Sequence, residues 1–539
     1  MKTWKKISLL FLIFALMAAC APSATTSPQT ASPAPAATAT LQPPSLPWWR
    51  KAVFYEIFVR SFQDSNGDGI GDFNGITNRL DYLQDLGVTA LWLMPINPSP
   101  SYHGYDVLNY YAVNPQYGTM ADFKKLLAEA HKRDMRVIMD LVLNHTSNQH
   151  PFFVSANSDV NSPYRDFYRW AATYPGTHWH TGNTGFYYGF FSDRMPDLNY
   201  ANPAVTTQIE QMSAFWLEMG VDGFRIDAAK HLVEEGEKFE NTVSNHAWLK
   251  GYYAAIKTDF PNAYTLGEIY GAGALVSKIY QNELDHIFNF EVASGSVNSA
   301  LGQANSGINS AITFAKKDNP QGDFATFLTN HDQERVMSTL RGDVNKAKVA
   351  AALLLTAPGT PFLYYGEEIG MTGKKPDEYI RTPMQWDASP NTGFTSGQPW
   401  IEINADFASG TNVAAEQADP ASLWNLYRQL IALRRAHPAL SMGDTLLPET
   451  ANRGVYALLR VDSFSGETLL ALVNLTGEPI SQYALSASGL PLPDGEAAPQ
   501  TLFGGETAAG VTISGGAFHA WQPLDSLPPY GIFIFQLSR

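Results

Sequence analysis

The chain has 539 residues, of which 45% are hydrophobic and 16% are charged. This length exceeds one ordinary domain, although a single large barrel can occupy most of such a chain, and the composition excludes bulk intrinsic disorder. The net charge is −15 and the isoelectric point is near 5.2, so nucleic acid is not an expected partner. The single cysteine excludes an intrachain disulfide framework and a zinc site built from several cysteines.

The N-terminal segment predicts export. Three lysines precede an apolar run over residues 7–19, which is shorter than the roughly 20 residues that a bilayer-spanning helix needs. The run ends in "LMAAC", which resembles a bacterial lipobox, where cleavage before Cys20 is coupled to acylation of its thiol. We therefore predict a lipoprotein signal peptide over residues 1–19 with Cys20 as the lipid attachment site. The alternative is an ordinary secreted protein in which Cys20 has no role.

Residues 20–47 consist almost entirely of Ala, Pro, Thr, Ser and Gln. Such a composition cannot bury enough apolar surface to order the backbone, so it predicts an extended, flexible tether. No later segment is long and apolar enough to span a membrane. We expect an exported bacterial lipoprotein, anchored to a membrane through its N-terminal lipid only or extracellular, and monomeric.

Strands and helices alternate along the body of the chain. Near-continuous apolar strands separated by helices predict a parallel sheet covered on both faces, and eight such units predict a (β/α)₈ barrel. The rival, a doubly wound open sheet, lacks support because no Gly-rich phosphate loop follows the first strand. Helical spacing is clearest at residues 76–86, 121–132, 206–219 and 423–435. The predicted strands are residues 53–60, 88–95, 136–142, 221–227, 264–268, 286–290, 325–329 and 361–365.

Two segments depart from this alternation. Residues 144–202, after the third strand, are aromatic, polar and turn-rich, which is long for a loop and predicts an inserted subdomain. Residues 441–539 show β-type runs with Gly, Pro and Ser turns, which predict a C-terminal antiparallel β domain. The barrel would then comprise residues 48–143 and 203–440.

Acidic side chains stand at the ends of four predicted strands. Because the active sites of such barrels lie at the C-terminal ends of the strands, we expect these side chains to converge on one mouth. Bringing like charges together costs stability. The alternative, in which each carboxylate caps the helix after its strand, is common for single residues and is disfavoured for four at once with Arg and His counter-groups. Convergent carboxylates suit either a metal site or glycoside cleavage. The carboxylates are Asp140, Asp227, Glu268 and Asp332, with Arg225 and His331 beside them.

Four motifs, in this order, resemble those of glycoside hydrolase family 13, the α-amylase family. They are "DLVLNH" at 140–145, "GFRIDAAKH" at 223–231, "GEIY" at 267–270 and "TNHD" at 329–332. The resemblance spans about residues 48–539. It implies the same barrel, insertion and C-terminal β domain, an α-glucan polysaccharide or oligosaccharide as substrate, and a retaining mechanism.

The resemblance also implies residue roles. Asp227 would be the nucleophile, Glu268 the general acid and then the base, and Asp332 would hold sugar hydroxyls and help to distort the ring. Such an enzyme needs one carboxyl ionised and one protonated. Asp140 would be a structural partner of the site. The implied substrate-binding residues are Tyr105, Asp106, His145, Arg225, Lys230, His231, His331 and Arg381.

The segment "DSNGDGIGD" at 64–72 matches the first half of a calcium loop. It is not an EF-hand, because the twelfth position is Gly75 rather than Glu. The resemblance implies a structural Ca²⁺ in this loop, and a plain Asx-rich turn is the alternative. The implied ligands are Asp64, Asn66, Asp68, the Ile70 carbonyl and Asp72. A second Ca²⁺ would use Asn144, Asp197 and the His231 carbonyl, with a further ligand unidentified.

The motifs favour different members of the family. The segment "DAAKH", with Lys230 and His231, resembles that of amylases. The segment "RTPMQWD" at 381–387 and the calcium loop instead resemble those of oligo-1,6-glucosidases and trehalose synthases. The segment "MPDLN" at 195–199 resembles that of a group intermediate between the two. We predict an α-amylase that cleaves α-1,4-glucosidic bonds of starch-like polysaccharides and maltooligosaccharides. The alternatives are an α-glucosidase or oligo-1,6-glucosidase, or a transglycosylase such as trehalose synthase. A non-catalytic surface carbohydrate-binding lipoprotein is disfavoured, because all three catalytic carboxylates are present.

Overall fold

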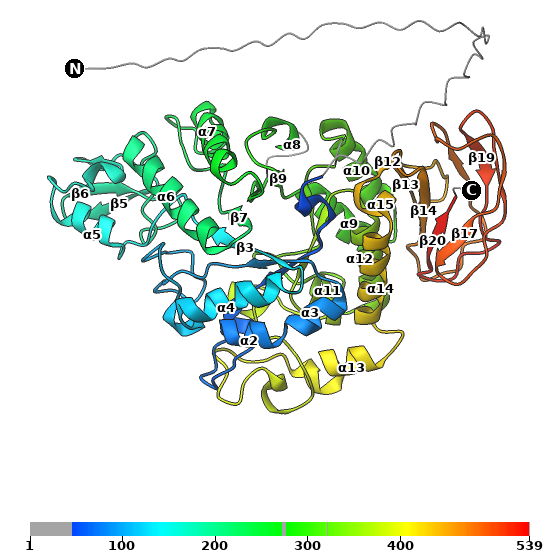
Figure 1. The fold of residues 1–539 in the computed structure, drawn as a ribbon, viewed down its shortest axis with the longest axis horizontal. Coiled ribbons are helices and arrows are strands. Elements are labelled where there is room, and N and C mark those ends of the chain that lie inside the picture. Colours follow the sequence, from blue (N-terminus) through cyan, green and yellow to red (C-terminus); the bar gives the residue numbers. More distant parts are fainter. Residues whose placement is uncertain (1–45, 272–275, 321, 538–539) are drawn as a thin grey trace, which may run out of the picture. The chain divides into compact units, whose positions relative to one another are not determined.

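In the computed structural model of the chain, the structure describes residues 46–271, 276–320 and 322–537. The predicted signal peptide, Cys20 and almost all of the predicted tether lie outside the described residues. Eight parallel strands form the centre of the described part (Figure 1). They are β1 (Phe54–Ile57), β2 (Ala90–Leu93), β3 (Arg136–Leu141), β7 (Gly223–Ile226), β8 (Tyr264–Gly267), β9 (His286–Ile287), β10 (Ala325–Thr326) and β11 (Thr360–Tyr364).

These strands close into a barrel. Their order is β10-β11-β1-β2-β3-β7-β8-β9, and a parallel bridge between Phe288 and Ala325 joins the two ends of the sheet. The predicted (β/α)₈ barrel is therefore confirmed, with each strand where an apolar run predicted it. Several strands end earlier than predicted. The first ends at Ile57 rather than residue 60, because the chain turns into α1 (Val59–Phe62), and the strands predicted at 286–290 and 325–329 end at Ile287 and Thr326.

Aromatic side chains fill the barrel interior. Strand residues alternate between the two faces, so every second side chain points inward. The rings of Phe54 and Phe362, on neighbouring strands, stack with their centroids 4.2 Å apart, and Phe288 packs edge-on against Phe362 at 5.1 Å. This packed interior leaves the mouth of the barrel as the place for a ligand.

Helices cover the outside of the barrel (Figure 1). The predicted helix at 76–86 is broken at Arg79 into α2 (Phe73–Asn78) and α3 (Leu80–Leu86). Gly87 and Gly220 end α3 and α6 in the left-handed conformation, with φ of 98° and 109°, and both lead directly into a strand. The other long helices are α4 (Met120–His131), α6 (Pro203–Met219), α7 (Val243–Asp259), α9 (Phe290–Gly302), α10 (Ser306–Asp318), α12 (Val344–Thr356) and α14 (Leu423–Ala436).

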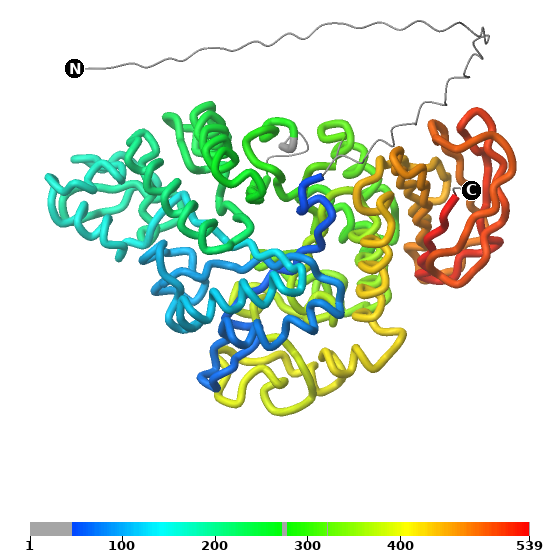
Figure 2. Tube along the Cα trace, viewed as in Figure 1, coloured from blue at the N-terminus to red at the C-terminus, as the bar shows by residue number. Residues whose placement is uncertain are grey.

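Between β3 and α6 the chain leaves the barrel, as the cyan part of Figure 2 shows. This excursion contains α5 (Pro151–Ser158) and a three-stranded antiparallel sheet in the order β4-β6-β5. Its strands are β4 (Trp170–Ala171), β5 (Trp179–Gly182) and β6 (Gly185–Tyr188). The excursion follows the C-terminal end of β3, so its loops reach the barrel mouth. Its predicted boundaries at 144 and 202 stay predictions.

The C-terminal residues form antiparallel sheets, as predicted. The main sheet has the order β12-β13-β14-β20-β17, and its apolar face has its own core, which includes Leu459, Leu470 and Phe535. Its strands are β12 (Asp444–Leu446), β13 (Val455–Asp462), β14 (Glu467–Asn474), β17 (Gln500–Phe503) and β20 (Ile532–Gln536). Two smaller pairs are β15 (Leu485–Ala487) with β19 (Phe518–Trp521), and β16 (Gly495–Ala497) with β18 (Val511–Ile513).

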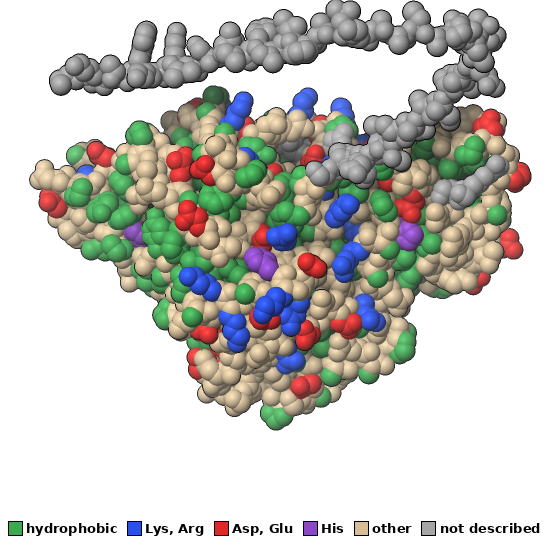
Figure 3. Space-filling view, viewed as in Figure 1, with side chains coloured by type: hydrophobic (Ala, Val, Ile, Leu, Met, Phe, Trp, Pro, Cys, Tyr) green, Lys and Arg blue, Asp and Glu red, His purple; other side chains and the backbone are tan. Residues whose placement is uncertain are grey.

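The surface mixes charges of both signs. On the face seen in Figure 3, Lys and Arg side chains lie among Asp and Glu side chains. Ion pairs such as Arg136–Asp222 and Arg428–Asp85, both at 2.9 Å, join opposite charges on the outer helices and loops. Within the described ranges, no helix combines the length and the apolarity that crossing a membrane requires.

Candidate active site

A cavity of about 440 Å³ lies at the C-terminal ends of the barrel strands. The loops that follow β2, β3, β7, β8, β10 and β11 build its walls, and the excursion after β3 adds an aromatic and thioether side. All three predicted catalytic carboxylates reach this cavity. The lining residues are His103, Tyr105, His145, Phe191, Ser192, Met195, Asp227, Ala228, Glu268, Asp332, Asp377 and Arg381.

Arg225 joins three of the carboxylates from beneath. It is fully buried, and its Nη1 donates to Asp227 Oδ1 at 2.7 Å and to Asp140 Oδ1 at 2.9 Å. Its Nη2 lies 3.1 Å from Glu268 Oε2. Charge-assisted bonds of this kind are the stronger hydrogen bonds in proteins, so one guanidinium orients all three carboxylates together.

The backbone after β7 also orients Glu268. Ala228 has a φ of 47°, a left-handed conformation that is unfavourable for a residue with a Cβ atom. In this conformation its N–H donates to Glu268 Oε2 at 3.0 Å. The strained residue therefore lies at the site itself, where it ties the end of β7 to the end of β8.

Burial raises the pKa of Asp227 to about 8, with Arg225 opposing the shift and Glu268 and Asp140 adding to it. Burial and the neighbouring carboxylates therefore raise the proton affinity of Asp227. A glycosidase that works through a nucleophile and a general acid needs two carboxyl groups whose environments push their pKa values apart.

The pKa of Asp332 is shifted in the opposite direction from that of Asp227. Its Oδ2 lies 3.0 Å from His331 Nε2, and its Oδ1 accepts from Arg381 Nη2 at 3.0 Å. Burial raises the pKa of Asp332, but His331 and Arg381 outweigh burial and hold it well below the ordinary value. Asp332 is therefore ionised at neutral pH and faces the cavity as an acceptor for hydroxyl groups.

Glu56 is a residue of this network that sequence reasoning missed. It lies in β1, is 2% exposed, and contacts His331 Nδ1 through its Oε1. Burial lowers the pKa of His331, but Asp332 and Glu56 outweigh it and raise the value to about 9. The signal was a lone glutamate in the apolar run "FYEIF", where the strand period points it into the barrel.

Tyr105 and His145, two of the predicted substrate-binding residues, both line the cavity. The Tyr105 hydroxyl lies 2.6 Å from His331 Nε2 and donates to Asp140 Oδ2 at 3.0 Å, while its ring lines the cavity. His145 also lines the cavity, and burial lowers its pKa to about 4, so its imidazole is neutral. Both are thus placed to meet hydroxyl groups without adding positive charge.

Three predicted substrate contacts are placed differently. Asp106 is buried and accepts from the hydroxyls of Ser99 and Ser101, so its contacts hold the loop after β2 together. Lys230 donates to the Tyr270 carbonyl at 2.6 Å and pairs with Glu240. His231 stacks on Phe190 with ring centroids 4.5 Å apart. None of these three residues lines the cavity. Arg225 and His331 do not line it either, but they contact the carboxylates that do, Asp227 and Asp332.

Six wall residues were not among the predicted site residues: His103, Phe191, Ser192, Met195, Ala228 and Asp377. Met195 and Ala228 fall within the motifs "MPDLN" and "GFRIDAAKH", and the other four lie on loops without a regular period. Phe191 is 46% exposed and packs edge-on against His145, with ring centroids 5.5 Å apart. Exposed aromatic surface beside a polar cavity suits the apolar face of a sugar ring.

The segment 64–72 offers oxygen atoms only. Asp64 and Asp72 are buried, and Asn66 and Asp68 are exposed. Their side-chain oxygens accept backbone N–H groups within the loop at 2.8–2.9 Å. Across residues 46–271, 276–320 and 322–537, no three His, Cys, Asp or Glu side chains are gathered as a metal cluster. The donor set, with an amide and a main-chain carbonyl beside the carboxylates, suits the hard cation Ca²⁺.

The second predicted metal position contains buried oxygen atoms without hydrogen-bond partners. Asn144 Oδ1, Asp197 Oδ2 and Glu234 Oε1 are all of this kind. Burial and Glu234 together raise the pKa of Asp197 well above its ordinary value. Unsatisfied buried oxygens are costly, and a cation would satisfy them, so these residues fit Ca²⁺. Glu234, which was not among the predicted residues, adds a carboxylate to this position.

Comparisons with known proteins agree with this geometry. The family described as "Alpha amylase, catalytic domain" matches residues 56–443. "Alpha-amylase 3" of Dictyoglomus thermophilum is 43% identical over 419 residues, which covers 76% of this chain and 82% of that protein. "Oligo-1,6-glucosidase" of Halalkalibacterium halodurans is 34% identical over 521 residues, which covers 80% of this chain and 91% of that protein.

Solved structures give the same result. The α-amylase from H. orenii has a TM-score of 0.77 and 36% identity, covering 90% of this chain and 99% of that one. A trehalulose synthase from Pseudomonas mesoacidophila has a TM-score of 0.79 and 31% identity, covering 92% and 100%. With the match over residues 56–443, these likenesses show that the chain belongs to the α-amylase family, glycoside hydrolase family 13, and is a glycoside hydrolase.

Proposed function

We propose that the enzyme hydrolyses α-1,4-glucosidic bonds of starch-like polysaccharides and maltooligosaccharides with retention of the anomeric configuration. One observation carries the proposal: Asp227 and Glu268 both line the cavity at the mouth, and both contact the Arg225 guanidinium, at 2.7 and 3.1 Å. A retaining glycosidase needs such a pair flanking the bond that breaks.

In the first step, Glu268 donates its proton to the glycosidic oxygen while the Asp227 carboxylate attacks the anomeric carbon. The bond to the leaving sugar breaks, and a covalent glycosyl–Asp227 intermediate forms. In the second step, Glu268 takes a proton from water, the water oxygen attacks the same carbon, and Asp227 leaves as a carboxylate. Asp332 holds hydroxyls of the sugar, and the negative mouth stabilises the positive charge that develops on the ring.

The α-1,4 preference is supported by two features. Lys230 and His231 follow the nucleophile as they do in amylases, and the relative named an α-amylase is 43% identical. An oligo-1,6-glucosidase is the second candidate. A relative of that name is 34% identical over 521 residues, and the segment "RTPMQWD" at 381–387 resembles that group.

Product analysis separates the two. Purified enzyme is incubated with amylose, panose, isomaltose, maltose and sucrose, and the Asp227→Asn variant serves as the control for contaminating activity. We expect maltooligosaccharides of several lengths from amylose and no cleavage of isomaltose. Glucose as the sole product, with isomaltose cleaved, would establish the oligo-1,6-glucosidase instead. Conversion of sucrose or maltose into an isomer would establish a transglycosylase.

The retaining mechanism has its own test. Glu268→Gln removes the acid, but an α-glucosyl fluoride needs no proton to lose its leaving group. The variant should therefore accumulate a glycosyl-enzyme, visible by mass spectrometry as added mass on the peptide that contains residue 227. Label on another carboxylate, or a product of inverted anomeric form by NMR, would overturn the assignment.

We also propose that the enzyme binds structural calcium. One ion would bind in the 64–72 loop through Asp64, Asn66, Asp68, the Ile70 carbonyl and Asp72. A second would bind Asn144, Asp197, the His231 carbonyl and Glu234. Neither set includes a reacting group, so calcium would hold the loops around the mouth in place and take no part in bond cleavage.

We further propose that the enzyme is exported and anchored by a lipid on Cys20. The support is the sequence alone: a basic start, a short apolar run and a single cysteine at its end. In a bacterial host, radiolabelled palmitate should enter the wild type but not Cys20→Ser. Normal processing and membrane association of Cys20→Ser would refute the proposal.

A further inference from the structure

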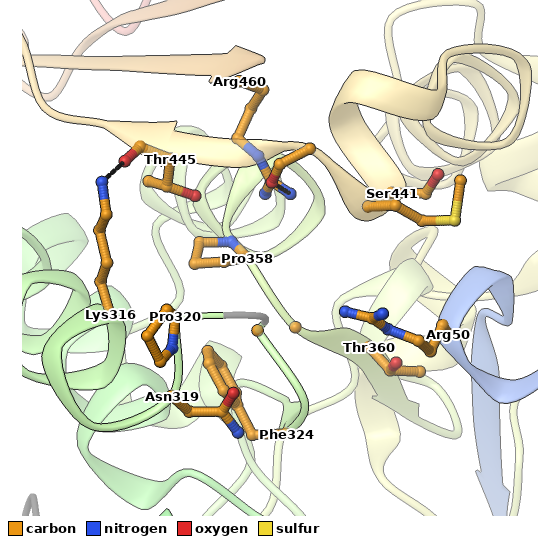
Figure 4. Close-up of a pocket in the computed structure, with 14 residues that line it drawn as sticks. Arg50, Lys316, Asn319, Pro320, Phe324, Pro358, Thr360, Ser441, Thr445 and Arg460 are labelled. Atoms are coloured by element: carbon orange, nitrogen blue, oxygen red, sulfur yellow. Dashed lines mark hydrogen bonds between the residues drawn. The ribbon is translucent and has the colours of Figure 1, made fainter. Parts of the chain in front are cut away.

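A second, smaller cavity lies at the junction between the barrel and the C-terminal β domain (Figure 4). It lies at the other end of the strands from the active site, since Phe324 and Gly359 directly precede β10 and β11. Its volume is about 20 Å³, room for one water-sized ion or molecule. Arg50, Lys316 and Arg460 are the charged residues among those that line it.

Arg460, on β13, is the buried member of this set. It is 1% exposed; its Nη1 donates to the Thr356 carbonyl at 3.0 Å and its Nη2 to the Gly443 carbonyl at 2.9 Å. Its Nε is buried and has no hydrogen-bond partner. Arg460 can donate five hydrogen bonds, so donors remain beyond these two carbonyls.

A second guanidinium adds to this charge. Arg434, on α14, is 2% exposed and donates to the Leu355 and Ala357 carbonyls at 2.9 and 3.0 Å, and also to the Gly359 carbonyl. Burial lowers the pKa of Arg434 to about 9, and the charge of Arg460 adds to that effect. Burial also lowers the pKa of Arg460 to about 10.

No carboxylate pairs with either arginine among the residues that the structure describes. Asp444 opposes the lowered pKa of Arg460, but Asp444 is exposed and forms no ion pair with it. The carbonyl partners lie at the C-terminal ends of α12 and of α15 (Pro438–Met442). A helix C-terminus carries roughly half a negative charge, so two of them offset about one of the two positive charges.

About one positive charge is therefore left beside a cavity that admits one small species. Figure 4 shows the side chains of Arg460 and Arg50 entering this space from different elements, with Lys316 bonded to the Thr445 carbonyl at its rim. Arg50 forms an ion pair with Asp323 at 2.9 Å, so the excess positive charge beside the cavity comes from Arg434 and Arg460. We propose that this junction is a binding site for a small monovalent anion of chloride size.

Bromide locates the site directly, because it replaces chloride and scatters anomalously. Crystals of the wild type grown in bromide should show an anomalous peak between Arg460 and Lys316. A peak only at Arg225 or Arg381, or no peak at all, would overturn the proposal. Sulfate and phosphate are too large for the cavity, so equal binding of either would also overturn it.

Solution measurements then test whether the anion stabilises the fold. At constant ionic strength, with gluconate replacing chloride, the melting temperature of the wild type should rise with chloride and saturate. Lys316→Gln removes a rim cation and should weaken the apparent chloride affinity at least threefold. Lys317→Gln, the neighbouring exposed residue outside the cavity, is the matched control and should respond as the wild type does.

Arg460→Met should abolish the saturable response altogether. If that variant fails to fold, Lys316→Gln and the bromide map still decide the question. A melting temperature independent of chloride, or one that changes equally in Lys316→Gln and Lys317→Gln, would reject the anion site. Both results leave the glycosidase assignment untouched, since neither residue reaches the catalytic cavity.

Discussion

The two ends of the barrel deal with buried charge in opposite ways. At the mouth, Arg225 meets Asp140, Asp227 and Glu268, so carboxylates outnumber the cation that joins them. At the opposite end, Arg434 and Arg460 meet only carbonyl oxygens. The mouth is thus negative and the junction with the C-terminal domain is positive.

This difference follows from what each end does. Glycoside cleavage passes through a positively charged ring, and an excess of carboxylate around the cavity stabilises that charge. The junction performs no chemistry, and its cations bind the free carbonyls at helix ends, which would otherwise be buried without partners. A change at the mouth should therefore affect catalysis, and a change at the junction should affect stability.

The largest effect should come from Asp227→Asn. Without the attacking carboxylate no glycosyl-enzyme forms, and kcat/KM should fall by about 10⁶-fold, the scale seen when a catalytic nucleophile is removed. The melting temperature should stay the same or rise, because burial disfavours the ionised form of Asp227. Initial rates and thermal unfolding check both parts. A loss of activity below tenfold would contradict the assigned role.

Removal of calcium should have the second largest effect. It should destabilise loops near the mouth and leave the bond-breaking groups in place. An ion that binds only the folded state adds about 2.7 kcal/mol at a hundredfold excess over its Kd. Chelation should therefore lower the melting temperature of the wild type. Asp68→Ala should reduce this response, whereas Asp81→Ala, an exposed acid outside the loop, should not. An unchanged melting curve after confirmed loss of metal would argue against both sites.

Arg460→Met tests the positive end. The Thr356 and Gly443 carbonyls would lose a charged donor, and each such hydrogen bond contributes about 1.5–3 kcal/mol, so the free energy of unfolding should fall by about 2 kcal/mol or more. Urea unfolding measures the change, and Arg453→Met, an exposed arginine on the same domain, is the control. The kcat/KM of both variants should equal that of the wild type. Lost activity with intact stability would contradict the division between the two ends.

The smallest effect concerns pH. The pKa of His331 is raised from 6.5 to about 9, so the stability it contributes is fully present below pH 6.5 and is lost as the pH rises through 9. A pKa difference of one between the folded and unfolded states corresponds to about 1.4 kcal/mol. Glu56→Gln removes one of the two acids that raise this pKa, so the alkaline fall in melting temperature should move to lower pH. If the melting temperature of Glu56→Gln fell over the same alkaline pH range as that of the wild type, Glu56 would not act through His331.

Much of this protein followed from local patterns. The eight strands were predictable because strands buried on both faces must be apolar almost throughout, and the glycines at 87 and 220 marked where helices end. Asp227, Glu268 and Asp332 were predictable because parallel strands bring their C-terminal ends to one edge. Element boundaries were predicted less accurately. The first strand ends at Ile57 and is followed by a short helix, and Arg79 interrupts a predicted helix.

Only the tertiary structure decided the rest. Glu56 and His331 are 275 positions apart, and Arg460 and Thr356 are 104 apart, so no periodic pattern relates either pair. Phe191, Met195 and Asp377 reach the cavity from loops whose paths depend on packing rather than on residue period. Asp106 and Lys230 carried motif signals for substrate contact, yet nearby serines and a backbone carbonyl take up their polar groups. The sequence by itself thus determined which strands form and which carboxylates meet, because burial and strand period act locally; long-range packing decided which charges are paired.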